Sequence, residues 1–117
     1  MSLKIRSATK NDMLDVLNLI KELAVYEKEP NAVEINAEDL IDHAFSDKPL
    51  FQCFVAVINN KIVGMSLGYP RYSTWKGPTM HLEDLIVTKN HRGSGIGQAL
   101  FSNFIKSSSE KGVKRIE

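Results

Sequence analysis

A glycine-rich segment, Arg92-Gly93-Ser94-Gly95-Ile96-Gly97, has the composition of a turn that binds phosphate. It lies between an apolar, strand-like run that ends at Val87 and an amphipathic, helix-like run that begins at Ile96. A helix start leaves backbone N–H groups unpaired and carries the positive end of the helix dipole, so it binds anionic oxygens well. Glycines let the backbone approach such a ligand closely, and Arg92 adds a cation beside it. The segment therefore predicts a site for a phosphate or pyrophosphate group.

Two common phosphate-binding loops do not fit this spacing. Gln98 stands where a dinucleotide-binding G-x-G-x-x-G motif that starts at Gly93 needs its last glycine. No Gly-Lys-Ser or Gly-Lys-Thr sequence follows, as a nucleoside-triphosphate-binding loop requires. A nucleotide-binding module is therefore the weakest of the functions considered. The alternative of a plain glycine turn that caps a helix stays open.

Two adjacent carboxylates, Glu83 and Asp84, precede the turn on the same strand-like run. Alkyl ammonium groups have a pKa of about 10.4, so an enzyme that acylates an amine near neutral pH must remove a proton, and a carboxylate can accept it. Neighbouring residues of a regular strand point to opposite faces, so only one of the two is expected to face a site directly. The alternative is that both are solvated carboxylates near a strand end.

Composition restricts the class of protein further. The 117 residues with 43% hydrophobic content suffice for one domain with a single core. A formal net charge of +1 argues against nucleic acid or an anionic membrane as the partner. The lone Cys53 cannot form an internal disulfide and is expected in the core, and the histidines (His43, His81 and His91) show no metal-ligand spacing. We expect a cytoplasmic protein that uses no metal.

The elements that must position these residues follow from hydrophobic periodicity and turn residues. The predicted strands cover residues 3–6, 51–58, 61–69, 80–87 and 113–117. The predicted helices cover 13–27, with Tyr26 and Glu27 at the end, 36–45 and 96–111. Thr9 and Asp12 form an approximate capping box, Asn59 and Asn60 suit a hairpin turn, and residues 70–78 are predicted to form a loop. This order, β-α-α-β-β-β-α-β, predicts one mixed α/β (α+β) domain with a mostly antiparallel sheet flanked by helices.

The glycine turn matches the pyrophosphate signature of the GNAT superfamily of N-acetyltransferases: Arg or Gln, two residues, Gly, one residue, then Gly or Ala. Further segments resemble the diamine (spermidine/spermine) acetyltransferases of that superfamily, in the same order along the chain. These segments are Arg6-Ser7-Ala8-Thr9, residues 19–27, Trp75 with Gly77, and Leu82-Glu83-Asp84 with Val87. The resemblance implies the superfamily's fold, acetyl-CoA as the donor, and direct transfer to a primary amine in a ternary complex without a covalent intermediate.

The resemblance also implies where the donor binds. A strand that exposes its backbone groups would pair with the pantetheine arm, and the glycine turn would surround the pyrophosphate. N–H groups near Leu85 and Ile86 would stabilise the oxyanion of the tetrahedral intermediate. The residues implied in acetyl-CoA binding are Leu85, Ile86, Val87, Arg92, Gly93, Ser94, Gly95, Ile96, Gly97 and Gln98.

For the acceptor amine, the resemblance implies that Glu83 takes the proton through water and that Asp84 makes a secondary contact. Tyr26, Glu27 and Trp75 would also contact the amine. Tyr26 and Trp75 are equally well explained as packing aromatics.

The sequence departs from this resemblance in two respects. Members normally continue past the position that matches Glu117, so we expect the chain to lack the last third of the domain, including a tyrosine that protonates the leaving thiolate. Ser73 stands where the polyamine enzymes tend to place another acid, so thialysine stays open beside polyamines and diamines as the substrate. We expect an N-acetyltransferase that forms a homodimer, or alternatively a noncatalytic acyl-CoA-binding or dimerisation fragment.

Overall fold

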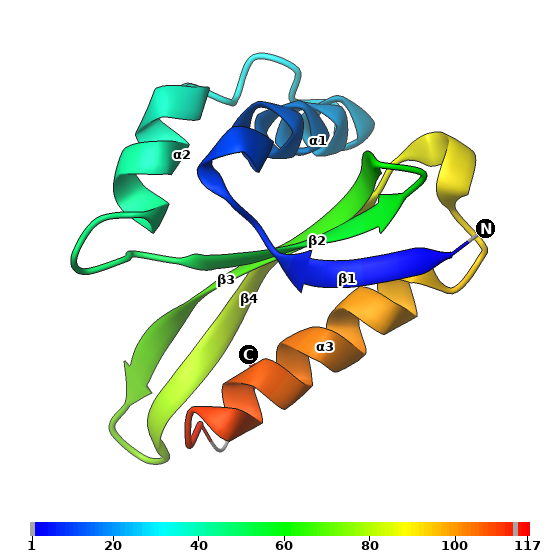
Figure 1. Cartoon of the computed structure of the whole chain (residues 1–117). Coiled ribbons are helices and arrows are strands. Elements are labelled where there is room, and N and C mark those ends of the chain that lie inside the picture. The colour runs from blue at the N-terminus through cyan, green and yellow to red at the C-terminus, as the bar shows by residue number, and fades with distance from the viewer. Residues whose placement is uncertain (1, 114) are drawn as a thin grey trace.

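A computed structural model describes residues 2–113 and 115–117 of the chain (Figure 1). The elements in chain order are β1 Leu3–Ser7, α1 Met13–Tyr26, α2 Ala37–Ala44, β2 Gln52–Ile58, β3 Lys61–Ser73, β4 Gly77–Val87 and α3 Ile96–Glu110. Short 3₁₀ turns, Lys10–Asp12 and Lys89–His91, precede α1 and follow β4. The predicted order of strands and helices is confirmed up to the end of α3.

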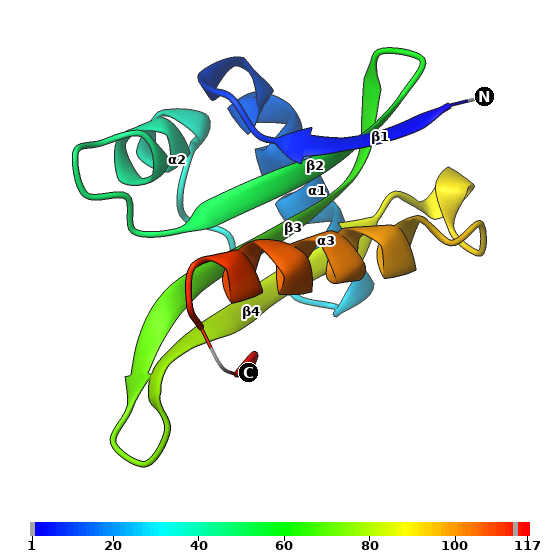
Figure 2. The same ribbon diagram turned by 60° about the horizontal axis from the view of Figure 1, so that its bottom comes forward.

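The four strands form one antiparallel sheet in the order β1-β2-β3-β4. Helices α1 and α2 cover one face of the sheet and α3 covers the other, as the two views show (Figures 1 and 2). This is the mixed α/β arrangement with a flanked antiparallel sheet that the sequence predicts. The hairpin turn predicted at Asn59 and Asn60 is also confirmed, because both residues adopt positive φ (52° and 64°), as a tight two-residue turn requires.

The core on the α1/α2 face is built by the apolar stripe of α1. Met13, Val16 and Leu17 of α1 are buried against Met65 and Leu67 of β3. The three-to-four spacing of the helix residues places them on one side of α1, and the alternation of the strand residues places theirs on one side of β3. The two periodicities together position α1 beside the acidic end of β4.

On the other face, two glycines of β3 let α3 approach the sheet closely. A Cβ atom on Gly68 would overlap the ring of Phe104 and the carbonyl oxygen of His81, and one on Gly64 would lie 2.9 Å from the Ile86 carbonyl oxygen. Phe104 and Leu100 of α3 are completely buried there. The start of α3, which follows the glycine turn, is thereby fixed beside the end of β4.

The loop predicted over residues 70–78 is wrong. Strands β3 and β4 continue through this segment as a long hairpin, and Pro70 pairs with Met80 and Tyr72 with Pro78. Met80 directs its N–H to the Arg115 carbonyl (3.0 Å) and its carbonyl to the Glu117 N–H (2.8 Å), so its backbone groups face away from β3. The missing N–H of Pro70 therefore costs no hydrogen bond, and the same alternation applies to Pro78.

The strand predicted over residues 113–117 is only partly described, because Lys114 lies outside the described residues. Ile116 forms a parallel bridge with Met80, and Leu82 N–H donates to the Glu117 carbonyl at 2.7 Å. The end of the chain thus covers the outer edge of β4 only as far as Leu82.

A buried carboxylate joins β1 to the start of α1. Asp12 is 7% exposed and accepts hydrogen bonds from Arg6 (2.7 Å) and from the Thr9 N–H (2.7 Å), which is the second half of the predicted capping box. The hydrogen bond from Arg6, supported by those from Thr9, holds the pKa of Asp12 below its ordinary value. A carboxyl whose pKa is lowered by folding stabilises the protein above its unfolded pKa, and this contribution is lost as the pH falls through the folded value.

We therefore expect Asp12→Asn to lower the free energy of unfolding by about 1–3 kcal/mol at pH 7. Urea denaturation at pH 7 and again below about pH 4, where the carboxyl of the unfolded chain is protonated, measures this difference. The gap between the wild type and the variant should narrow at the lower pH. An equal gap at both values would show that the charge of Asp12 is not what stabilises the junction.

Candidate active site

The glycine turn leads from β4 into α3 with the geometry of an anion-binding helix start. Gly93 and Gly95 have φ of 81° and 86°, a region that side chains disfavour. The N–H of Ala99 donates to the Gly95 carbonyl (3.1 Å), whereas the N–H groups of residues 96–98 donate to no backbone carbonyl among the described residues. Three donors at the positive end of a helix are therefore available to phosphate oxygens.

Gly97 differs from the other two glycines because its backbone does not require glycine. A Cβ atom there would make only an ordinary contact, 3.8 Å from Val87 Cγ2. The position lies in the first turn of α3 beside the end of β4. The absence of a side chain keeps the helix start open toward Val87, which suits a bulky pyrophosphate.

The last part of β4 has an open outer edge that begins where the bridge to Ile116 ends. Thr88 N–H donates to the Val63 carbonyl (2.8 Å), so by alternation Ile86 faces β3 while Leu85 and Val87 face outward. The N–H and carbonyl of Leu85 and the N–H of Val87 have no backbone partner among the described residues. Of the two N–H groups predicted to stabilise an oxyanion, only that of Leu85 thus points outward; the second outward N–H belongs to Val87.

A groove of about 250 Å³ runs along this edge. It is lined by Leu23, Tyr26, Leu85, Ile86, Val87 and Arg92. Its outward N–H and carbonyl groups suit a ligand that contains amides, such as a pantetheine arm. The strand that lines this groove, β4, leads along the chain into the glycine turn, so one extended molecule can occupy both.

Arg92 ties the end of α1 to the end of β4. Its Nε donates to the Val87 carbonyl (2.8 Å), its Nη2 lies 3.3 Å from Glu22 Oε2, and its guanidinium lies 5.3 Å from the centre of the Tyr26 ring. Glu22 also accepts a hydrogen bond from Thr88 Oγ1 (2.9 Å). Through these contacts with Val87, Glu22 and Tyr26, Arg92 forms part of the groove wall. This role is additional to the phosphate contact that the sequence predicts for it.

The other residues of the turn lie at the surface. Ser94 Oγ donates to the His91 carbonyl (2.8 Å), which closes the turn, and the Gln98 side chain contacts Ser102 (3.3 Å) on the outside of α3. Neither side chain is aimed into the groove by these contacts. Ser94 and Gln98 would therefore bind a phosphate through their backbone N–H groups and not through their side chains.

The acidic pair lies at a bulge in β4. Leu67 pairs with Asp84 but the next residue of β3, Gly68, pairs with Leu82, so Glu83 is an extra residue on β4. At such a bulge the alternation of side chains is interrupted. Glu83 and Asp84 consequently line the same cavity, and the expectation that only one of them faces a site is wrong.

The two carboxylates differ in their surroundings. Burial, followed by the charges of Glu83 and Glu27, raises the pKa of Asp84 above its ordinary value. The Glu83 side chain is 52% exposed and lies 3.3 Å from His81 Nε2, while Arg71 Nη1 lies 3.3 Å from His81 Nδ1. Because an arginine can only donate, Nδ1 accepts and the neutral imidazole carries its proton on Nε2, directed at Glu83.

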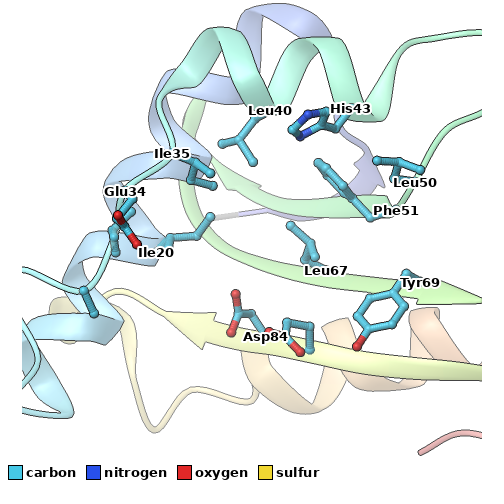
Figure 3. Close-up of a pocket in the computed structure, with 13 residues that line it drawn as sticks. Ile20, Glu34, Ile35, Leu40, His43, Leu50, Phe51, Leu67, Tyr69 and Asp84 are labelled. Carbon is cyan, nitrogen blue, oxygen red and sulfur yellow. The ribbon is translucent and has the colours of Figure 1, made fainter.

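We name the cavity beside the acidic pair the α2 cavity (Figure 3). Its volume is about 560 Å³, within the range of small-molecule sites. Its walls come from α1, the α1–α2 loop, α2, the residues before β2, and strands β3 and β4. The lining residues that sequence reasoning missed include Glu34, His43 and Tyr69, and the apolar Val33 and Ile35 within a polar connection were the available signal.

The predicted amine contacts are only partly brought together. Tyr26, at the end of α1, is 70% exposed and lines the groove, and the charge of Glu27 acts on Asp84. Trp75 lies at the tip of the β3–β4 hairpin, is 92% exposed, and does not line the groove or the α2 cavity. The structure therefore joins Tyr26, Glu27, Glu83 and Asp84 around the end of β4 but leaves Trp75 apart from them.

Cys53 belongs to the core, as the sequence predicts. It is 8% exposed, and burial raises the pKa of its thiol to about 12. A protonated, buried thiol is a poor nucleophile. Within the described residues, no three His, Cys, Asp or Glu side chains converge where a metal ion can bind, and no helix is long and apolar enough to cross a membrane.

The structure combines an antiparallel sheet between helical layers with an open strand edge that leads into a glycine turn. These features define a class of acetyl-transferring enzymes. The sequence profile of the acetyltransferase (GNAT) family matches residues 13–117. The chain belongs to this family. The fold and the pyrophosphate signature that the sequence predicts agree with that assignment.

Particular relatives narrow the class. The chain is 37% identical to thialysine N-epsilon-acetyltransferase of Bos taurus over 96% of its own length and 71% of the relative's. It is 40% identical to the human spermidine/spermine N(1)-acetyltransferase-like protein 1 over 80% of its length, which is 14% of that longer protein. An aminoglycoside acetyltransferase from an uncultured soil sample, solved in complex with sisomicin, superposes with a TM-score of 0.80 at 28% identity, covering 98% of this chain and 75% of the other. The family and these relatives together identify an N-acetyltransferase.

Proposed function

We propose that the protein transfers an acetyl group from acetyl-CoA to the primary amine of a small molecule. The observation that carries this proposal is the succession of three features along β4 and the segment after it: the acidic pair at the α2 cavity, the open edge at Leu85 and Val87, and the glycine turn. An amine held at the acidic pair would lie within one or two residues of the strand edge where an acetyl group can be held. Thialysine and spermidine, named for the relatives, are acceptors to be tested.

Acetyl-CoA supplies the acetyl group as a thioester. The amine nitrogen bonds to the carbonyl carbon, and the tetrahedral intermediate then breaks its carbon–sulfur bond, with the electron pair leaving on sulfur. The second nitrogen proton passes through solvent to the thiolate, so that the products are a neutral amide and the CoA thiol. The residues of the chain prepare this exchange. A Glu83 carboxylate oxygen accepts a proton of the ammonium through water, which frees the nitrogen lone pair. The outward N–H of Leu85 would donate to the carbonyl oxygen as negative charge develops on it. Holding both reactants on one strand supplies much of the rate acceleration.

The location, oligomeric state and freedom from metals stay predictions. We propose a cytoplasmic homodimer that binds neither nucleic acid nor membrane, in line with the net charge of +1. The acceptor is proposed to be a small amine because the α2 cavity has a volume of about 560 Å³, within the range of small-molecule sites, and three of its lining residues, Glu34, Glu83 and Asp84, are acidic.

Transfer of labelled acetyl groups from acetyl-CoA to a panel of amines tests the proposal. The panel should contain spermidine, diaminopropane, thialysine, pentylamine and a histone-tail peptide. We expect product with at least one small amine and a lower kcat/KM for the peptide. A preference for the peptide would contradict the proposed substrate class, and no transfer to any amine would contradict the proposed reaction.

A further inference from the structure

The α2 cavity has an acidic side and an apolar side. In Figure 3, Glu34 and Asp84 lie toward one side of the cavity, and Leu50 and Phe51 lie toward the opposite side. Together with Glu83, these two carboxylates are the acidic groups among the described residues that line it. The acidic side is therefore the place where an ammonium group can exchange its hydration for charged partners.

The apolar side offers a second cation no comparable charged partner. Leu50 and Phe51 form its walls, and the ionisable residues nearest to them in Figure 3 are His43 and Tyr69, neither of which is a carboxylate. An ammonium group placed against these walls would lose hydration without gaining a carboxylate. Neutral His43 does not replace a carboxylate, and protonated His43 would repel the ammonium.

On the basis of the proposed amine acetylation, we infer that the acceptor carries a single ammonium group on an apolar chain or ring, rather than one cation at each end as diamines and polyamines do. The ammonium lies between Glu34 and Asp84, with Glu83 beside it. The apolar body fills the space toward Leu50 and Phe51. Each further methylene buried on that side should strengthen binding about fourfold, until the cavity is filled.

Leu50 is the residue that best tests this division. Its side chain lines the apolar side, is 62% exposed, and stands before β2 rather than within the core. Its backbone N–H donates to the His43 carbonyl at 2.8 Å, a contact that a side-chain substitution leaves in place. Leu50→Glu would place a carboxylate where a second ammonium lies, and Leu50→Gln is the matched uncharged control.

Isothermal titration calorimetry with pentylamine and cadaverine, the diamine of the same length, makes the comparison without an acetyl donor. We expect pentylamine to bind the wild type at least about tenfold more tightly, and butylamine, pentylamine and hexylamine to improve in that order. Leu50→Glu should make the affinities for the two ligands equal or reverse the preference. Leu50→Gln should lower the affinity for pentylamine without raising that for cadaverine.

The inference is overturned if cadaverine binds the wild type as tightly as pentylamine, if affinity does not change with chain length, or if Leu50→Glu and Leu50→Gln behave alike. Failure of the proposed acetyl transfer would give a different set of results from failure of this inference. Selective binding of monoamines with no acetyl transfer would contradict the proposed function alone, whereas efficient transfer to cadaverine in preference to pentylamine would contradict this inference alone.

Discussion

Gly97→Glu is expected to abolish the thermal stabilisation by CoA while the fold stays intact. A ligand at about 100 times its Kd stabilises the native state by about 2.7 kcal/mol, which raises the Tm of a domain of this size by about 10 °C. The substituted carboxylate would stand at the helix start among the free N–H groups of residues 96–98, where it occupies the phosphate position and repels the ligand. A Cβ there contacts only Val87, and an acidic residue suits the first turn of a helix, so the variant should fold.

Gly97→Ala is the matched control for that experiment. Alanine favours a helix over glycine by up to about 1 kcal/mol, and its methyl group meets Val87 Cγ2 at an ordinary 3.8 Å. The family signature also admits alanine here, so the response to CoA should persist. An undiminished Tm shift in Gly97→Glu, measured by differential scanning fluorimetry, would remove the glycine turn from the donor site.

Glu83→Gln is expected to lower kcat/KM for the amine about 10²- to 10⁴-fold near neutral pH, since it removes the proposed proton acceptor. The loss should be largest at low pH. It should shrink as the pH rises toward about 10, because solvent then supplies the neutral amine directly. A pH series of initial rates, followed by the release of free CoA, measures both effects.

Glu34→Gln makes the same change of charge in the same cavity, away from the open edge of β4. It should raise KM for the amine and leave kcat and the shape of the pH profile nearly unchanged. If Glu83→Gln behaves in this way too, Glu83 binds the amine without accepting its proton. If Glu34→Gln reproduces the full loss, the cavity acts through its net charge and the assignment to Glu83 is wrong.

Sequence patterns sufficed for those parts of the fold that local physics determines. The stripe from Met13 predicted α1, and its end at Tyr26 agrees with the predicted end at Tyr26 and Glu27. Asn59-Asn60 predicted the hairpin turn. The hairpin of β3 and β4 was missed because Pro70 and Pro78 signal a loop locally. A strand accepts a proline where the missing N–H would point away from the partner strand. Which positions these are depends on how the two strands pair, and the local sequence does not show it.

The site was predicted by residue type more successfully than by geometry. Glu83 and Asp84 were identified as candidates, but their common direction depends on a bulge that no local pattern marks. Tyr69 and His43 reach the α2 cavity from elements distant in sequence, so only the folded chain brings them to the acidic pair. Trp75 was chosen for its ring, and the long hairpin places it away from the cavity.

The most direct test of the donor site is a titration of the ¹⁵N-labelled protein with CoA, followed through the backbone amide resonances. We expect the largest shifts on two groups of amides, Leu85 with Val87 on the open edge of β4, and residues 96–98 at the start of α3. The amide of Ile86, which faces β3, should shift less than its two neighbours. Shifts confined to other parts of the chain, or no saturable shift at these amides, would show that β4 and the glycine turn do not hold the acetyl donor.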